Sequence, residues 1–205
     1  VDAVSVVEIG PLGVSMVDAG NPCVFIAADA LGLVGTEMPE TLDSQLELLD
    51  QLEAVRCSAS VAMGISDSME AAAKISGIPK VALVSPPQSA ATLSGDPLDA
   101  SQCDITLRMI SVGQPHRAIP VTGSMCAAIA AQITGTVVNR LCRPATVPDD
   151  IRIAHPSGVA RVGATVDQKK GKWIADNAVL YRTARRLMDG HVYVSAARTP
   201  GLSID

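Results

Sequence analysis

Residues 121–135, VTGSMCAAIAAQITG, combine a short polar start with a long apolar run. Thr122, Gly123 and Ser124 precede an apolar stretch that contains one strongly polar residue, Gln132. Thr122 or Ser124 can act as the N-cap of a helix, because a hydroxyl oxygen accepts a hydrogen bond from a first-turn amide. The first amides of a helix lack acceptors within the helix and carry partial positive charge, so such a start can bind an anion.

This pattern admits two interpretations. A helix that is apolar on all sides and too short to cross a membrane lies in the centre of a core, and its polar start is then only a cap. In the other interpretation, Gly123 keeps the helix start free of side-chain bulk so that the backbone can hold something negatively charged. The residue pattern alone leaves both interpretations open.

Other polar residues lie near the ends of predicted strands. Lys80 enters an otherwise apolar strand, where it could pair with a carboxylate as a mobile point charge or be solvated at the strand end. His116 lies six residues before Thr122 and could bind a carboxylate, relay a proton or shape the turn. We expect Ser85, Met109 and Ser111, also at strand ends, to face the same region.

The cysteines predict neither a metal site nor a disulfide framework. The chain has five of them, none in a CxxC pair, which is poor spacing for zinc and for disulfides. Cys126, one turn into the apolar helix, is a weak candidate for acid–base chemistry, because a thiol at such a position is typically buried and inert. We therefore expect no metal and a reducing, cytoplasmic setting.

Composition excludes several classes of protein. Of the 205 residues, 48% are hydrophobic but only 2% are aromatic, so the core must be built from aliphatic side chains. The net charge of -5 argues against a nucleic-acid partner, which needs a basic face, and the bases would find few aromatic platforms. No apolar run is long enough to span a membrane, so we expect no membrane partner.

Apolar periodicity and turn residues predict the elements around these candidates. Residues 39–63 have leucines at helical spacing opposite acidic residues, which predicts an amphipathic helix, and a shorter helix should cover 67–75. Glycine- and proline-containing turns separate short strands in residues 3–25. We further expect strands at 80–85 and 104–113, an exposed loop at 89–102, a linker at 143–150 and a hairpin at 151–167. Residues 184–188 (ARRLM) could be helical, but the Val and Tyr content and the Asp189-Gly190 turn favour strands at the end of the chain. These elements together predict an α+β domain.

Five stretches of the sequence resemble the 2-methylaconitate cis–trans isomerase family, which includes 4-oxalomesaconate tautomerases and methylitaconate isomerases. The layout is more distantly similar to diaminopimelate epimerase, where a GNP turn and an A-C-G-[ST]-G loop opening a central helix come in the same order. The five stretches are GNPCVFI (20–26), IPKVALVSPP (78–87), GQPHRAIPVTGSMCAAIAA (113–131), IRIAHPSG (151–158) and RTARRLMDGHVYV (182–194).

The resemblance implies a diaminopimelate epimerase-like barrel of mixed β-sheet wrapped around a central helix. Residues 1–205 would be one domain, the C-terminal half of a two-domain isomerase whose N-terminal half, with a lysine proposed as acid/base, lies outside this sequence. The implied chemistry is a cofactor-independent cis–trans or allylic proton shift on a small unsaturated di- or tricarboxylate. The partners would be that polycarboxylate and the N-terminal half, and a homodimer stays open. The isolated half would be inactive.

The resemblance also suggests roles for individual residues. Asn21 aligns with a ligand-contacting Asn of the epimerase, although Asn also suits a turn for its backbone. Lys80 aligns with a substrate-contacting Asn, and Thr122 replaces the epimerase's acid/base Cys. Because a Thr hydroxyl is too weak an acid, we expect this half to bind substrate and the missing half to supply the base. The substrate-binding candidates are Asn21, Lys80, Ser85, Met109, Ser111, His116, Thr122, Gly123, Ser124 and Met125, and the weak catalytic candidates are Cys126 and His116.

Two other functions stay open on the same residues. The first is an amino-acid racemase or epimerase, against which the loss of the loop Cys counts. The second is a non-catalytic carboxylate-binding module, in which the anion site is present without a base.

Overall fold

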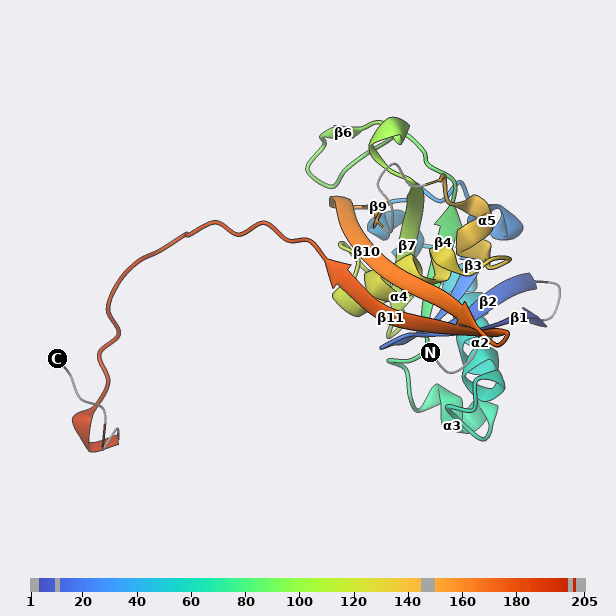
Figure 1. Cartoon of the computed structure of the whole chain (residues 1–205), viewed down its shortest axis with the longest axis horizontal. Coiled ribbons are helices and arrows are strands. Elements are labelled where there is room, and N and C mark those ends of the chain that lie inside the picture. The colour runs from blue at the N-terminus through green and yellow to red at the C-terminus, as the bar shows by residue number, and fades with distance from the viewer. Residues whose placement is uncertain (1–3, 10–11, 145–149, 199–200, 202–205) are drawn as a thin grey trace.

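A computed structural model describes residues 4–9, 12–144, 150–198 and 201 (Figure 1). The first half contains β1 (Val4–Ile9), β2 (Leu12–Asp18), β3 (Pro22–Ala27), η1 (Ala28–Leu31), α1 (Pro39–Asp43), α2 (Leu46–Ala62), α3 (Met69–Ala73), β4 (Lys80–Ser85), β5 (Ala90–Ala91), β6 (Pro97–Leu98) and η2 (Ala100–Gln102). The second half contains β7 (Ile105–Ser111), β8 (Gln114–Pro115), α4 (Val121–Gln132), α5 (Val137–Leu141), β9 (Asp150–His155), β10 (Gly158–Lys169), β11 (Lys172–Leu180) and η3 (Ala196–Arg198).

One mixed sheet organises the fold. Its strands follow the order β1-β2-β3-β4-β7-β9-β10-β11, and β8 pairs with β7. The pairs β3–β4 and β7–β9 are parallel, whereas the other neighbours in the sheet run antiparallel. The sheet curls so that β10 and β11 lie over α4 on the side away from β3, β4 and β7 (Figure 1). This mixed sheet curled around a helix confirms the predicted α+β class and the barrel-like wrapping.

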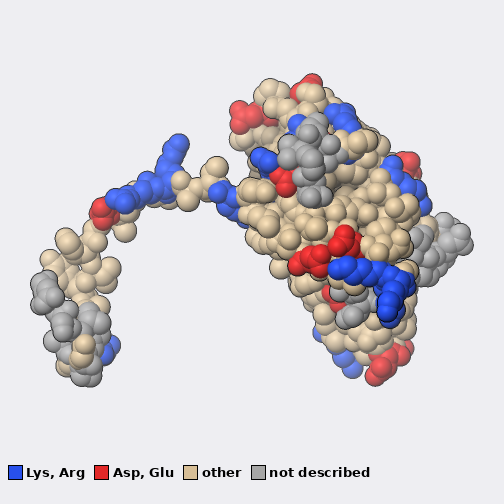
Figure 2. Space-filling model, in the orientation of Figure 1, with Lys and Arg blue, Asp and Glu red and all other residues tan. Residues whose placement is uncertain are grey.

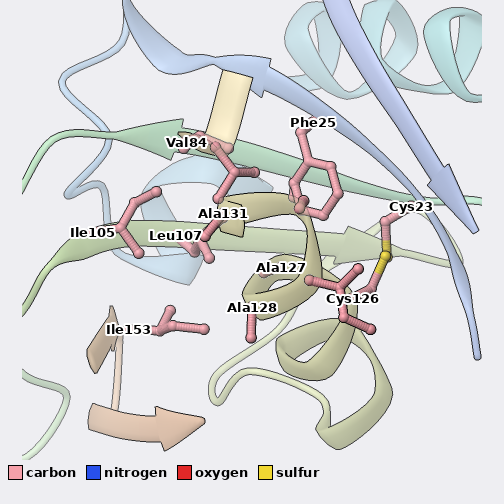
Figure 3. Packing of buried hydrophobic residues seen from close by; sticks show 14 of the residues in the cluster. Cys23, Phe25, Val84, Ile105, Leu107, Cys126, Ala127, Ala128, Ala131 and Ile153 are labelled. Carbon is pink, nitrogen blue, oxygen red and sulfur yellow. The ribbon is translucent and has the colours of Figure 1, made fainter. Parts of the chain in front are cut away.

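α4 is the centre of the larger core. Eight of its twelve residues are buried, and the main apolar cluster surrounds it with side chains from β3, β4, β7, β9 and β10. Figure 3 shows Ala127, Ala128 and Ala131 packed among Phe25 and Ile153, which come from opposite sides of the helix. Small side chains let strands approach closely from several directions, so the prediction of a buried helix inside a sheet is confirmed.

The opposite face of the sheet is covered by α2. Leu52 and Val55 of this helix pack on a second cluster that includes Leu83 and Ile110 of β4 and β7. The predicted single helix over 39–63 is wrong in one respect, because the chain leaves helical geometry at Gln45 (φ -96°, ψ 73°), which separates α1 from α2. Leu46, expected on the apolar side, is 70% exposed as a consequence.

Most of the other predicted elements are confirmed. The short strands of residues 3–25 are β1–β3, with their first turn outside the described residues. The second predicted helix is α3, capped by the Ser68 hydroxyl, which accepts a hydrogen bond from the Ala71 amide at 3.2 Å. β9 and β10 form the predicted hairpin, and residues 89–102 form a loop apart from the two-residue strands β5 and β6 and the turn η2. Of the predicted linker, residues 145–149 lie outside the described residues.

The expectation of strands around Asp189-Gly190 is wrong for this chain. β11 ends at Leu180, and residues 181–195 form neither helix nor strand. Figure 1 shows this segment running away from the body of the molecule. The strand-forming residues are there, but no described strand lies beside them to pair with their backbone.

Candidate functional site

The strand directions bring most of the predicted site residues to one end of the sheet. β3 and β4 are parallel, so the turn that holds Asn21 and the start of β4 at Lys80 lie at the same end. β7 runs antiparallel to β4 and ends there at Ser111. The start of α4 lies there as well, because Thr122 contacts Asn21 directly. We call this region the Lys80 end.

The start of α4 at this end has no side-chain cap. The N-cap residue is Pro120, so the expectation that Thr122 or Ser124 caps the helix is wrong. Ser124 lies inside the helix, where its hydroxyl donates to the Val121 carbonyl at 2.7 Å and its amide donates to the Pro120 carbonyl at 2.8 Å. The hydrogen bond from the Ser124 amide is the first backbone hydrogen bond of the helix, so the amides of residues 121–123 have no acceptor within the helix. An uncapped helix start with partial positive charge is suited to an oxyanion.

Asn21 and Thr122 form a polar pair beside these amides. The Asn21 Nδ2 donates to Thr122 Oγ1 at 2.9 Å. The Asn21 Oδ1 is buried and has no hydrogen-bond partner in the described part of the chain. Because Thr122 Oγ1 accepts from Asn21, the threonine hydroxyl can direct its own hydrogen at a ligand.

Lys80 supplies a positive charge next to the helix start. Within the described residues, no carboxylate oxygen lies within 4.0 Å of its ammonium nitrogen. A Cβ added at Gly123 would lie 3.9 Å from Lys80 Cδ and 2.8 Å from the end of Met109. Gly123 therefore leaves room for the end of Met109 over the helix start, with Lys80 beside it. Met125, half-buried, packs against the core below.

Ser111 and His116 form a second polar pair at this end. The Ser111 hydroxyl and His116 Nε2 are 2.7 Å apart, and the His116 amide donates to the Met109 carbonyl at 2.8 Å. Burial lowers the pKa of His116, and the positive charge of Lys80 lowers it further. The imidazole is therefore neutral at pH 7, where it can hold a hydrogen bond but adds no positive charge for a carboxylate.

Two of the predicted site residues are not part of the Lys80 end. Lys80, like Val84, belongs to the α4 face of β4, whereas Ser85 lies on the opposite face and about 16 Å further along the strand. Cys126 is fully buried, and its thiol donates to the Val17 carbonyl at 3.3 Å. A hydrogen bond with Cys23 and burial raise the pKa of Cys126 well above its usual value, so this thiol is inert.

Comparison with known proteins gives the family of the chain. The sequence model of the PrpF protein family matches residues 1–195. This chain belongs to the PrpF protein family. It is 37% identical to a 2-methyl-aconitate isomerase of Shewanella oneidensis, over 95% of this chain and 49% of that protein. It is 36% identical to a 3-methylitaconate isomerase of Eubacterium barkeri, over 92% of this chain and 49% of that protein.

A solved structure supports the fold of this PrpF-family chain. The crystal structure of a methylitaconate-delta-isomerase superposes with a TM-score of 0.81 and 35% identity. The superposition covers 95% of this chain and 50% of that one. The PrpF chain therefore spans about half the length of the relatives it matches.

Sequence reasoning missed a cavity next to the start of α4 in this PrpF chain. It has a volume of about 380 Å³ and is lined by Ala118 and Ile119, by His155, and by Tyr181 and Arg182 among others. Burial lowers the pKa of His155 to about 4, and the charges of Arg108 and Arg182 add to the effect. Apart from Tyr181, these residues lie in three of the stretches that carry the family resemblance, but no spacing in the sequence connects them.

The described residues of the PrpF chain give no sign of a metal or of a membrane span. Among them, no group of three or more His, Cys, Asp or Glu side chains is arranged to hold a metal ion. Across the same residues, no helix combines the length and the apolar character that crossing a bilayer requires.

Proposed function

We propose that this chain is the substrate-binding half of a cofactor-independent isomerase that acts on small unsaturated di- or tricarboxylates. The observation that supports it best is the convergence of an unpaired ammonium, an uncapped helix start and the Asn21–Thr122 pair at the Lys80 end. Lys80 would bind one substrate carboxylate as a point charge. The amides of residues 121–123 would bind an oxygen of the same or a second carboxylate.

The proposed reaction moves a proton along an allylic system. A base removes a proton from carbon next to a double bond that carries a carboxylate, and the electron pair spreads into that carboxylate. The proton then returns to a different carbon of the allyl system, so that no cofactor is consumed. The negative charge grows on carboxylate oxygens, where the helix start and Lys80 would stabilise it.

The base is expected outside the residues described here. Thr122 is too weak an acid, Cys126 is buried in the core, and the neutral His116 is engaged with Ser111. We therefore propose that the half of the PrpF proteins that this chain does not match supplies the base and completes the site at the Lys80 end. A homodimer, the acid that serves as substrate and a cytoplasmic location stay predictions.

The names of the relatives narrow the substrate class without selecting one acid. Those relatives are named as isomerases of 2-methylaconitate, 3-methylitaconate and oxalomesaconate, all unsaturated polycarboxylates. A non-catalytic carboxylate-binding module is the second candidate, because Lys80 and the first amides of α4 are suited to anions and none of the groups described at the Lys80 end is a strong base.

An exchange experiment separates the two candidates. This chain is co-expressed with the part of the Shewanella oneidensis relative that it does not match. The purified protein is then incubated with 3-methylitaconate in heavy water. Incorporation of deuterium on carbon, seen by proton NMR, supports the isomerase. Binding of 3-methylitaconate without deuterium incorporation supports the carboxylate-binding module. Absence of both binding and incorporation contradicts a carboxylate site at the Lys80 end.

A matched pair of variants links the result to the Lys80 end. Lys80→Met keeps the aliphatic stem and removes the charge, so exchange should fall at least tenfold, as for loss of a charged hydrogen bond of about 1.5–3 kcal/mol. Lys74→Met makes the same change at an exposed lysine after α3 and should leave exchange unchanged.

A further inference from the structure

Arg56 of α2 is a buried arginine on the face of the sheet opposite α4. The lysines and arginines that Figure 2 shows lie on the surface of the body or along the residues after β11, whereas Arg56 is 2% exposed. Removing a guanidinium from water costs free energy, so arginines are rarely buried unless their N–H groups are paired. The partners of Arg56 therefore indicate what the buried side chain holds in place.

The five N–H groups of the Arg56 guanidinium all have acceptors. Nε and Nη2 donate to the two carboxylate oxygens of Glu53, one turn earlier on α2, at 2.7 and 2.6 Å. Nη2 also donates to the Ala72 carbonyl, and Nη1 donates to the carbonyls of Ile75 and Ile78, each at 2.9 Å. A lysine carries its three donors on one nitrogen, so only the planar fork of arginine reaches all these acceptors at once.

The three carbonyls belong to the connection from α3 to β4. Ala72 lies in the last turn of α3, and residues 74–79, which we call the Arg56 loop, lead from there into β4. A cation at the end of a helix binds its last carbonyls, so the contact with Ala72 alone would be a helix cap. The contact with Ile78 does more, because only Pro79 separates Ile78 from Lys80. The ring of Pro79 fixes its φ, so few free torsions lie between the held carbonyl and the Lys80 backbone.

The Arg56 loop also contacts the strand that carries the second polar pair of the Lys80 end. The Val112 amide donates to the Ser76 carbonyl at 3.3 Å. Val112 directly follows Ser111, whose hydroxyl oxygen lies 2.7 Å from His116 Nε2. Val112 has φ +53°, a left-handed geometry that β-branched residues rarely adopt, so the contact with the loop holds a strained position. The loop is therefore attached on one side to Lys80 and on the other to the turn that leads to His116.

Lys80 and His116 are close enough for the charge of one to act on the other. Burial lowers the pKa of His116, and the positive charge of Lys80 lowers it further. The Lys80 side chain also reaches the start of α4, where its Cδ would lie 3.9 Å from a Cβ added at Gly123. Because the interaction between charges weakens with distance, the pKa of His116 reports where the Lys80 ammonium lies.

We infer that Arg56 is a positioning residue for the Lys80 end, because it holds the Ile78 carbonyl and so fixes the position of Lys80 over the start of α4. The role of Arg56 is indirect, since it lies on the opposite face of the sheet and acts through Lys80. Its importance for binding rests on the proposed function, but the position of Lys80 can be measured without any ligand. Failure of the proposed function and failure of this inference are therefore distinguishable.

An NMR titration of His116 in this chain tests the inference without ligand. Arg56→Gln removes the charged fork and shortens the side chain, so the Ile78 carbonyl loses its donor and Lys80 moves away from His116. The pKa of His116 should therefore rise, as it should in Lys80→Met, which removes the charge itself. In the double variant, Arg56→Gln should add nothing to the effect of Lys80→Met.

Calorimetric titration with 3-methylitaconate measures the consequence for binding. The affinity should fall about tenfold in Arg56→Gln, within the loss expected for Lys80→Met itself, and the two losses should not add in the double variant. If the unmodified chain binds no 3-methylitaconate, the proposed function fails, and the His116 titration still decides whether Arg56 positions Lys80.

Two further variants separate positioning from stability. Arg108→Gln makes the same substitution at an arginine that is 3% exposed and also donates to backbone carbonyls, but beside the other end of β4. It should lower the melting temperature and leave the pKa of His116 and the affinity unchanged. If Arg56→Gln does not fold, Arg56→Lys replaces it in the test. This variant keeps a cation beside Glu53 but cannot reach all three carbonyls, so it should give a smaller rise in the pKa of His116.

Three outcomes would overturn the inference. The first is an unchanged pKa of His116 when Arg56 is replaced. The second is a rise of the same size in the Lys80→Met background, because Arg56 would then act on the burial of His116 and not through Lys80. The third is an equal rise in Arg108→Gln, because a general loosening of the fold would then account for the effect.

Discussion

Both ends of strand β4 have polar side chains without partners among the described residues, but these side chains differ in charge and in burial. At one end, Lys80 has no carboxylate partner among the described residues and stands over an uncapped helix start. At the other end, the hydroxyls of Ser85 and of its neighbour across the sheet, Thr106, are also without partners, but both residues are buried. Unpaired polar atoms occur at both ends, so they do not by themselves identify a site.

The arrangement of cations separates the two ends further. Arg108, beside the Ser85 end, is 3% exposed and donates to the carbonyls of Glu37 and Leu107 at 2.6 and 3.0 Å. Burial lowers its pKa to about 10. This arginine therefore holds the loop before α1 against the sheet, whereas Lys80 holds nothing within the described chain. We therefore propose the end of β4 with the accessible, unpaired charge as the binding end.

We expect the largest effect from a substitution that overpacks the Ser85 end of β4. Gly35 has φ +94°, and an added Cβ would lie 2.2 Å from the Ser85 hydroxyl oxygen. Gly35→Ala combines left-handed strain of about 1–2 kcal/mol with overpacking of about 1–3 kcal/mol, so the free energy of unfolding should fall by about 2–5 kcal/mol. Urea unfolding measures it.

Gly32 provides the control for that change. It has φ +70° and open space around an added Cβ, so Gly32→Ala should lose only the strain, about 1–2 kcal/mol. Equal losses of unfolding free energy in the two variants would mean that crowding against Ser85 adds nothing to the backbone strain at position 35.

The second effect is on binding at the Lys80 end. Lys80→Met should weaken 3-methylitaconate binding about 10- to 100-fold, because a charged hydrogen bond contributes about 1.5–3 kcal/mol. Stability should hardly change, since Lys80 makes no ion pair within the described residues. Calorimetric titration measures the affinity, and the Lys74→Met variant should bind like the unmodified chain. A larger loss of stability than of affinity would make Lys80 structural.

The third effect is a dependence of stability on pH. His155 has a folded-state pKa of about 4 against an ordinary value of 6.5, because burial and two arginines disfavour its charged form. Between these values the unfolded chain binds a proton that the folded chain does not, so stability falls as the pH drops from 6.5 to 4. His116, with a lowered pKa, adds to the same trend.

Thermal melting across this pH range tests the effect. His155→Asn removes the titrating group and keeps an oxygen that can accept from the Ser157 amide, the present partner of His155 Nδ1 at 3.2 Å. The variant should show a flatter decline in melting temperature on acidification. An unchanged slope would assign the decline to other groups.

The smallest effect is expected at Ser85. Its hydroxyl oxygen is buried without a partner in the described structure, and such a group costs stability. Ser85→Ala should therefore leave the free energy of unfolding unchanged or raise it by up to about 1 kcal/mol. Binding of 3-methylitaconate should not change, and any loss of affinity would return Ser85 to the site.

Local patterns predicted the elements of this fold well, and tertiary facts account for the misses. The uniform apolar run after Ser124 predicts a buried helix, because only a central position covers all its sides. The break at Gln45 leaves no trace in the leucine spacing, which continues through it. Pro120 as the N-cap was missed because hydroxyl residues two and four positions later are the usual capping signal.

Local patterns predict the features of the site that lie on one element, but not the contacts between residues far apart in the sequence. Lys80 and Ser85 are an odd number of residues apart on one strand, so their opposite faces follow from alternation alone. The pairing of Asn21 with Thr122 spans 101 positions, and only the resemblance to a family brought the two residues together in advance. His155 and Arg182 line a shared cavity through the β9–β10 hairpin and the end of β11, which no spacing reveals.

The Lys80 end is proposed to bind carboxylates through the start of α4. Backbone-amide NMR of this chain, titrated with 3-methylitaconate, tests it most directly. We predict that the largest shifts occur at the amides of residues 121–123, that they require about 10- to 100-fold more ligand in Lys80→Met, and that Lys74→Met leaves them unchanged. Saturable shifts confined to another part of the chain, or no shifts at the start of α4 at any concentration, would contradict the claim.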